Sequence, residues 1–119
     1  MADAASITFV ASDKLKGATL YDRADHKLGS IKELYLDPAT GHVAYVLGQA
    51  GGVFGVGGKY HPLPWHTLTP RPGAGYVANF TKSDLEHAPA YDQEQLAGSQ
   101  YAWSDQVDLY FGTLTAAKV

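Results

Sequence analysis

Hydrophobic and polar residues alternate in short runs over the first two thirds of the chain, and turn-forming residues separate the runs. A period of two is typical of β-strands that bury one face. The pattern predicts an edge strand or ordered arm at residues 7–10 and strands at residues 15–21, 28–37, 42–47, 60–65 and 75–80. Because Pro62 and Pro64 cannot donate hydrogen bonds to a neighbouring strand, we expect the run at 60–65 at a sheet edge.

The longest run, residues 28–37, predicts a bent strand. Its alternation changes phase, since Ile31 lies on one face and Leu34 and Leu36 lie on the other. A change of phase within one strand indicates a bulge or a sharp bend, which small closed sheets use to turn corners. The polar residues 22–27 before this run and the turn-forming residues 37–41 after it predict two hairpins.

The run at residues 42–47 is apolar on both faces. Val43, Tyr45 and Leu47 alternate on one face, and Ala44 and Val46 occupy the other. One face should line the core. The other face needs cover from the C-terminal segment or from another subunit.

Residues 48–58 hold six glycines and predict a mobile loop whose tip is apolar and includes Phe54. The loop does not match a phosphate-binding loop. Val53 stands where that pattern needs a glycine, and Tyr60 follows Gly58-Lys59 where it needs serine or threonine. We therefore expect no cofactor at this loop.

Helix signals replace the strand pattern after residue 82. Residues 83–86 fit a capping box at the start of a short helix that Pro89 ends, and residues 91–96 can form another turn. A further helix is expected from about Ser104 to Phe111, with Gly112 as its stop. Such a short helix is marginal alone, so its apolar stripe must dock on another surface. The stripe consists of Trp103, Val107, Tyr110 and Phe111.

Composition narrows the class of protein. A chain of 119 residues predicts one domain, and the lack of cysteine excludes disulfides, thiolate metal sites and cysteine nucleophiles. The net charge is −3, and the eight Lys and Arg of residues 1–82 are too dispersed to support nucleic-acid binding strongly. No signal peptide and no membrane-spanning run is evident, which predicts a cytoplasmic protein without direct membrane insertion.

Candidate catalytic and metal-binding residues are few. The five histidines lack the spacing of metal ligands, and His61 and His66 are expected on opposite faces of an extended segment. Asp22, Asp25 and Asp37 all lie in turn segments, where an aspartate is explained by hydrogen bonds to its own backbone. We therefore expect no enzyme and no metal site.

The order of several short motifs resembles a known family. The motifs are Leu15-Lys16-Gly17, Tyr21-Asp22, the run Leu28 to Leu34, Leu36-Asp37, Thr40-Gly41-His42-Val43, Phe54-Gly55 and Pro64-Trp65. In their order and spacing, residues 12–70 resemble the PRC-barrel family, which is found in the photosynthetic reaction centre H subunit and in the ribosome-maturation factor RimM. Glu33 and residues 60–62 depart from the usual pattern of that family.

This resemblance implies a mainly β fold, a small and strongly bent antiparallel β-barrel with a short C-terminal helical extension. It divides the chain into an N-terminal arm (1–11), a barrel (12–82) and an aromatic-rich extension (83–119). It also implies a non-catalytic adaptor or assembly module, with no catalytic residues to carry over. The reaction-centre role belongs to a chain with a membrane helix and is not transferred.

The hypothesis that follows is a module for protein–protein interaction that self-associates or binds another protein. Two alternatives remain: an RNA- or ribosome-associated factor like RimM, and an accessory protein that binds a small ligand or takes part in quinone-linked electron transfer. The residues expected to mediate the interaction are Val43, Tyr45, Leu47, Phe54, Trp65, Trp103, Val107, Tyr110 and Phe111.

Overall fold

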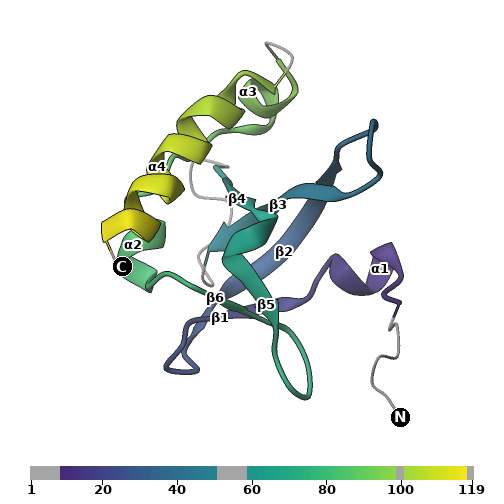
Figure 1. Cartoon of the computed structure of the whole chain (residues 1–119), viewed down its shortest axis with the longest axis vertical. Coiled ribbons are helices and arrows are strands. Elements are labelled where there is room, and N and C mark those ends of the chain that lie inside the picture. The colour runs from purple at the N-terminus through teal and green to yellow at the C-terminus, as the bar shows by residue number, and fades with distance from the viewer. Residues whose placement is uncertain (1–8, 51–58, 99–100, 118–119) are drawn as a thin grey trace.

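The computed structural model describes residues 9–50, 59–98 and 101–117. Its six strands form one mixed sheet in the order β4-β3-β2-β1-β6-β5, which curls into a half-barrel (Figure 1). The predicted bent and mainly β fold is confirmed, and β4 lies at a sheet edge as its prolines required. The strands are β1 (Thr19–Tyr21), β2 (Lys27–Leu36), β3 (Val43–Ala50), β4 (His61–Pro64), β5 (Leu68–Pro70) and β6 (Tyr76–Ala78).

The bend in β2 arises where the alternation changes phase. The pairing of β2 with β3 shifts register between Ile31 and Glu33 and again between Tyr35 and Leu36. The hairpin turn that follows is held by Asp37, whose carboxylate accepts the Ala39 N–H at 2.9 Å. The predicted bulge and hairpin are thus confirmed.

Three predictions about the strands are wrong. Residues 15–21 do not form one strand: a short helix, α1 (Ser12–Leu15), buries Leu15, and β1 begins only after Gly17, which has φ 91°. Of the two alternatives for residues 7–10, an edge strand or an ordered arm, the edge strand is wrong for Phe9 and Val10, which lie outside any strand with exposed side chains, while residues 7 and 8 lie outside the described residues. β6 pairs with β1 in parallel, so the sheet is not wholly antiparallel.

Two further elements in the sheet region have no counterpart in the predictions. They are η1 (Trp65–Thr67), a single 3₁₀ turn, and the three-residue strand β5 that follows it. The strand predicted at 75–80 is shorter and is β6. The start of the loop predicted at 48–58 is wrong, because Gly48 to Ala50 continue β3, while residues 51–58, with Phe54, lie outside the described residues.

Three helices follow the sheet and lie together on one side of it (Figure 1). They are α2 (Lys82–Glu86), α3 (Gln93–Ala97) and α4 (Trp103–Ala117). The capping box of α2 is built by Thr81 and Asp84 rather than by residues 83–86. The predicted stop at Gly112 is wrong, because a glycine inside a helix costs only about 1 kcal/mol and Leu114, beyond it, still packs against the core. None of the helices described is long and apolar enough to cross a membrane.

The stripe on α4 closes the hydrophobic core. Trp103, Val107 and Phe111 are 6%, 0% and 1% exposed, and they belong to the same cluster as the strand residues Leu20, Val46 and Leu63. The cover that the doubly apolar strand required therefore comes from the same chain. The sheet and the C-terminal helices share one core.

Side-chain hydrogen bonds fix the position of α4. They join it to β3, α2, α3 and the segment before α3, and Trp103 and Tyr110 donate to backbone carbonyls. The bonds are Tyr45 Oη to Asp108 (2.7 Å), Tyr110 Oη to the Asp84 carbonyl (2.6 Å), Trp103 Nε1 to the Leu96 carbonyl (3.0 Å) and Tyr91 Oη to Gln106 (2.8 Å).

Candidate functional site: an aromatic groove

An apolar cavity of about 550 Å³ lies between the β2–β3 hairpin and the beginning of α4. Its size is within the range of ligand-binding pockets, roughly 300–1,000 Å³. We call it the aromatic groove. Its lining residues are Leu34, Tyr35, Leu36, Pro38, Ala44, Tyr45, Tyr101, Trp103 and Ser104.

Aromatic rings contact one another around this groove. The Trp103 ring lies edge-on to Tyr35 and to Tyr45, with centroids 5.3 Å apart in both pairs. Tyr101 lies 5.9 Å from Tyr35 and 6.1 Å from Trp103. Edge-to-face pairs of this kind contribute about 0.5–1.5 kcal/mol each beyond their burial. The groove wall is therefore preformed.

Two apolar side chains of the groove are unusually exposed. Leu36 is 58% exposed and Tyr101 is 52% exposed. Tyr101 also has φ 65°, a conformation that bulky residues rarely adopt and that its contacts with Tyr35 and Trp103 must maintain. Exposed apolar side chains gathered in one place mark interaction surfaces.

Acidic residues flank the groove. Asp37 lies between the lining residues Leu36 and Pro38, and Asp105 follows Ser104 on α4. Asp108 accepts a hydrogen bond from the Tyr45 hydroxyl. Burial, and then the nearby Asp108 carboxylate, raises the pKa of Tyr45, so this hydroxyl stays a donor. None of the described residues that line the groove is Lys or Arg, and its rim therefore favours a cationic partner.

The structure separates the residues that the sequence singled out for interaction. Tyr45 and Trp103 line the aromatic groove, and Leu47 lines a second cavity beside it. Val107 and Phe111 lie on the buried face of α4, and Tyr110 lines a third cavity along the same helix. The remaining three are Val43, partly buried against the core, Trp65, packed on Tyr76 at 5.6 Å, and Phe54, outside the described residues. Their roles in binding stay a prediction.

Sequence reasoning missed Tyr35, Leu36 and Tyr101 as groove residues. The signal for the first two was the uninterrupted apolar run Leu34-Tyr35-Leu36. The strand pairing shifts register between Tyr35 and Leu36, and all three residues of the run line the groove. No local signal marks Tyr101, because its place depends on how the segment after α3 returns to the sheet.

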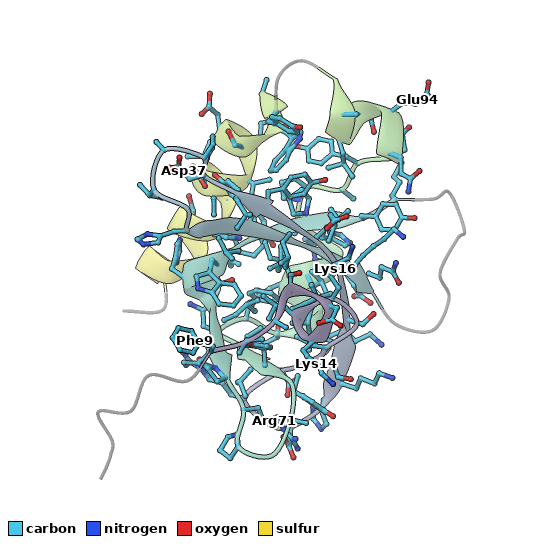
Figure 2. All side chains as sticks on the ribbon, turned by 90° about the vertical axis from the view of Figure 1, so that its right-hand side faces the viewer. Phe9, Lys14, Lys16, Asp37, Arg71 and Glu94 are labelled. Carbon is cyan, nitrogen blue, oxygen red and sulfur yellow. The ribbon has the colours of Figure 1, made fainter. Side chains whose placement is uncertain are left out.

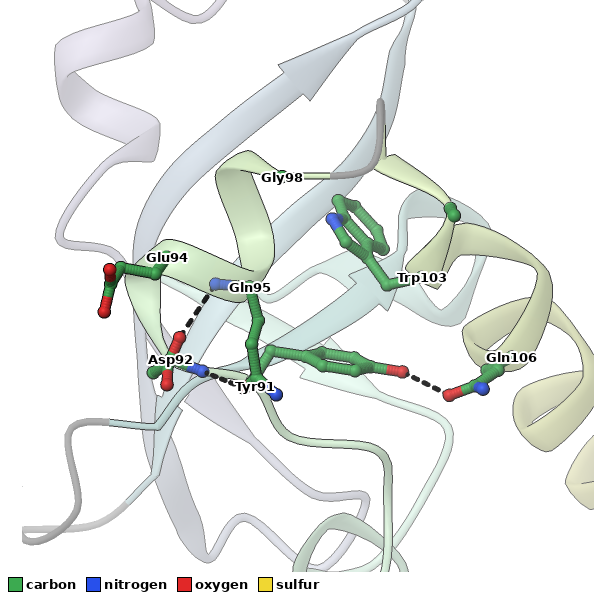
Figure 3. A pocket seen from close by; sticks show the side chains of 8 residues that line it. Tyr91, Asp92, Glu94, Gln95, Gly98, Trp103 and Gln106 are labelled. Atoms are coloured by element: carbon green, nitrogen blue, oxygen red, sulfur yellow. Dashed lines mark hydrogen bonds between the residues drawn. The ribbon is translucent and has the colours of Figure 1, made fainter.

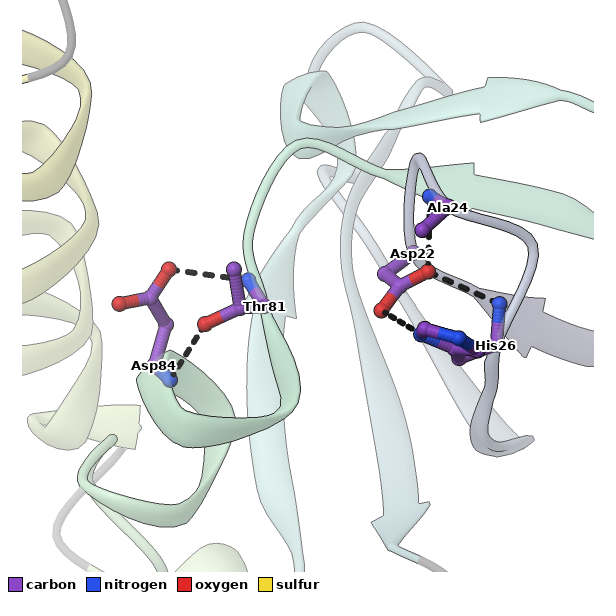
Figure 4. A network of polar contacts seen from close by, with 5 residues as sticks. All are labelled: Asp22, Ala24, His26, Thr81 and Asp84. Carbon is purple, nitrogen blue, oxygen red and sulfur yellow. Dashed lines mark hydrogen bonds and ion pairs between the residues drawn. The ribbon is translucent and has the colours of Figure 1, made fainter.

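The candidate carboxylates serve the turns in which they lie. Asp22 accepts the N–H groups of Ala24 and His26 at 2.9 Å and contacts the His26 ring at 3.2 Å (Figure 4). The His26 N–H is the largest cause of the lowered pKa of Asp22. Asp25 has φ 71° and binds Arg71 through both carboxylate oxygens, which lowers its pKa. Backbone hydrogen bonds of the turn therefore account for Asp22, as they do for Asp37, whereas the Asp25 carboxylate binds the Arg71 side chain instead of its own backbone.

The histidines do not converge. His61, the first residue of β4, is partly buried against the segment near Pro89, and burial lowers its pKa. His66, in contrast, is exposed on η1. Among the described residues no group of three or more His, Asp or Glu side chains is placed to hold a metal ion.

A polar cavity of about 530 Å³ lies between α3 and α4 (Figure 3). Four of its polar side chains already have partners: Tyr91 donates to Gln106 at 2.8 Å, and Asp92 and Gln95 form the capping box of α3. These groups hold the two helices in place. The aromatic groove, with its exposed apolar side chains, is the stronger candidate for binding.

A curled, mainly β half-barrel packed on one side by helices defines a small domain of the β-barrel class. A family model described as the PRC-barrel domain matches residues 7–85, about two thirds of the chain, and the protein therefore belongs to the PRC-barrel family. Domains of this family are generally non-catalytic. Comparison with curated proteins gives no match. The predicted boundaries of arm, barrel and extension stay a prediction.

Proposed function

We propose that this protein is a non-catalytic adaptor that binds an extended segment of another protein in the aromatic groove. The observation that carries the proposal is the preformed cluster of Tyr35, Tyr45, Tyr101 and Trp103 around a cavity of about 550 Å³. Grooves lined by aromatic rings suit extended, proline-containing peptide segments, because the polyproline II conformation of such segments is largely formed before binding. The acidic rim selects a segment with a lysine or arginine beside its apolar side chains.

The same rim argues against RNA as the occupant. Asp37, Asp105 and Asp108 would repel a phosphate backbone, whose binding depends on clustered Lys and Arg. A cytoplasmic location, expected from the sequence, is kept as part of the proposal.

Peptide display tests this function. Selection of random peptides on the folded protein should enrich sequences with aliphatic or proline residues next to Lys or Arg. In fluorescence anisotropy titrations, Leu36→Ser and Tyr101→Asn should each weaken the enriched peptides about tenfold, because each removes an exposed apolar contact from the groove. Asparagine is chosen at position 101 because it tolerates positive φ.

Leu109→Ser is the matched control, since Leu109 is 73% exposed on α4 and does not line the groove. It should leave the affinity unchanged. The proposal fails if no sequence is enriched, or if the enriched peptides bind the Leu36→Ser and Tyr101→Asn variants as tightly as the wild type.

Self-association is a second candidate, and an uncharged face of α4 favours it. This α4 face holds a cavity of about 380 Å³ whose lining residues, Gln106, Leu109, Tyr110, Thr113 and Leu114, carry no charge. An uncharged apolar face can meet its own copy about a two-fold axis without repulsion, whereas the acidic groove cannot.

Light scattering after size exclusion tests self-association. We expect a dimer at about 50 µM, a concentration at which a modest interface is occupied. Leu109→Lys should yield a monomer, because the two-fold axis brings the two new charges together. A wild-type monomer at this concentration would rule out self-association through α4, and the groove proposal would stand.

A further inference from the structure

A second cavity, of about 570 Å³, adjoins the aromatic groove. Tyr35 and Tyr101 line both cavities, and their contacting rings form the boundary between them. We call this second cavity the lysine cavity. Its lining residues are Lys16, Lys32, Glu33, Tyr35, Leu47, Gln93, Leu96, Ala97 and Tyr101.

The lysine cavity carries the opposite charge to the groove. Two lysines and one glutamate line it, and the Lys16 ammonium lies 3.5 Å from the Glu33 carboxylate. The Lys32 ammonium lies 5.6 Å from the centre of the Tyr60 ring, over its face. Because this contact is with a ring face, it leaves the three N–H donors of the ammonium able to form hydrogen bonds with an anion. Asp37 at the hairpin and Lys16 after α1 lie at separate places on the molecule (Figure 2).

From this charge arrangement we propose that the bound segment also carries an aspartate or glutamate, which Lys16 and Lys32 bind. The inference rests on the proposed function, since the lysine cavity continues the same binding surface. The apolar side chains of the segment would pack on Tyr35 and Tyr101. Its lysine or arginine would face Asp37, Asp105 and Asp108, and its carboxylate would lie in the lysine cavity. The two charges would fix the direction of the segment in the groove.

The length of the surface sets the spacing of the two charges. Both cavities follow β2, from Lys32 in the lysine cavity to Leu36 in the groove. At about 3.3 Å per residue, this part of the strand spans roughly 13 Å. The acidic and basic residues of the segment should therefore lie about three to five residues apart.

The probe is the tightest-binding peptide from the display selection, together with a copy in which each Asp or Glu is replaced by Asn or Gln. The neutral copy should bind wild-type protein about threefold to tenfold more weakly, as expected for two partly exposed ion pairs. The double variant Lys16→Gln/Lys32→Gln should bind both peptides with the same affinity. The double variant Lys27→Gln/Lys82→Gln loses the same charge outside the cavity and should behave as the wild type.

Glu33→Gln provides a test of opposite sign. It removes the carboxylate that competes for Lys16 but keeps an oxygen that can accept the Leu34 N–H, as Glu33 does at 3.0 Å. This variant should bind the acidic peptide about twofold to fivefold more tightly. If Glu33 has only a structural role, the Glu33→Gln variant should bind the acidic peptide more weakly than the wild type, or with the same affinity.

The results separate the inference from the function on which it rests. Enriched peptides without Asp or Glu, or equal binding of the acidic and neutral peptides, would overturn the role of the lysine cavity while leaving the groove as the binding site. Failure to enrich any peptide would remove the proposed function itself.

Discussion

Phe111→Ala is expected to lower the free energy of unfolding by about 3–5 kcal/mol, as burial of a large aromatic side chain implies. Phe111 is 1% exposed, and its ring centre lies 5.3 Å from that of Phe80, so α4 and the sheet region meet at this contact. The loss should be visible in chemical denaturation, because a domain is typically stable by only about 5–15 kcal/mol.

Leu109→Ala is the matched control on the same helix. Leu109 is 73% exposed, and its truncation should change the stability by no more than about 0.5 kcal/mol. Phe111→Leu, which keeps part of the buried volume, gives a smaller loss that can be measured if the alanine variant does not fold. A loss below about 1 kcal/mol for Phe111→Ala would show that α4 lies outside the cooperative core.

Gly75→Ala should be nearly as damaging, with an expected loss of about 2–5 kcal/mol. Gly75 has φ 83°, and a Cβ atom there would lie 2.6 Å from the Thr19 carbonyl oxygen of β1. That oxygen belongs to the backbone, so it can move only if the parallel pairing of β1 with β6 opens. Thermal or chemical denaturation measures the loss.

Gly73→Ala separates the clash from backbone strain. Gly73 has φ 98°, similar to Gly75, but a Cβ atom added there meets nothing within 4 Å. Its variant should lose only about 1–2 kcal/mol, the cost of positive φ for alanine. Equal losses for the two variants would mean that the approach of residue 75 to β1 is not close in solution.

Local sequence features predicted much of the fold. The phase change after Ile31 indicated the bulges of β2, and the prolines of residues 60–65 placed β4 at the edge. The helical spacing of Trp103, Val107 and Phe111 indicated the buried face of α4. Each of these features acts over a few residues, through backbone geometry or the period of side-chain direction.

Local features also misled where packing opposed them. The glycine at 112 signals a helix stop, but the favourable contacts of α4 with the sheet exceed the small cost of glycine in a helix. The run at 15–21 has strand-forming residues, yet burial of Leu15 and the positive φ of Gly17 divide it into a helix and a strand.

The candidate site was foreseen only in part. Tyr45 and Trp103 were expected to mediate interactions, and they do line the aromatic groove. Their contact with Tyr35 and Tyr101, and the lysine cavity beside them, were not foreseen. The residues of the two cavities come from β2, β3, the turn between them, α3, the beginning of α4 and the segments after α1 and before α4, and no spacing along the chain links them.

The sequence by itself determined the two hairpins on either side of β2, the edge position of β4 and the apolar face of α4, because proline, glycine and periodicity act locally. Only the tertiary structure decided the parallel pairing of β1 with β6 and the joining of the aromatic groove to the lysine cavity. Both depend on close contact between segments distant in sequence, and that contact is set by the packing of one core shared by the sheet and the C-terminal helices.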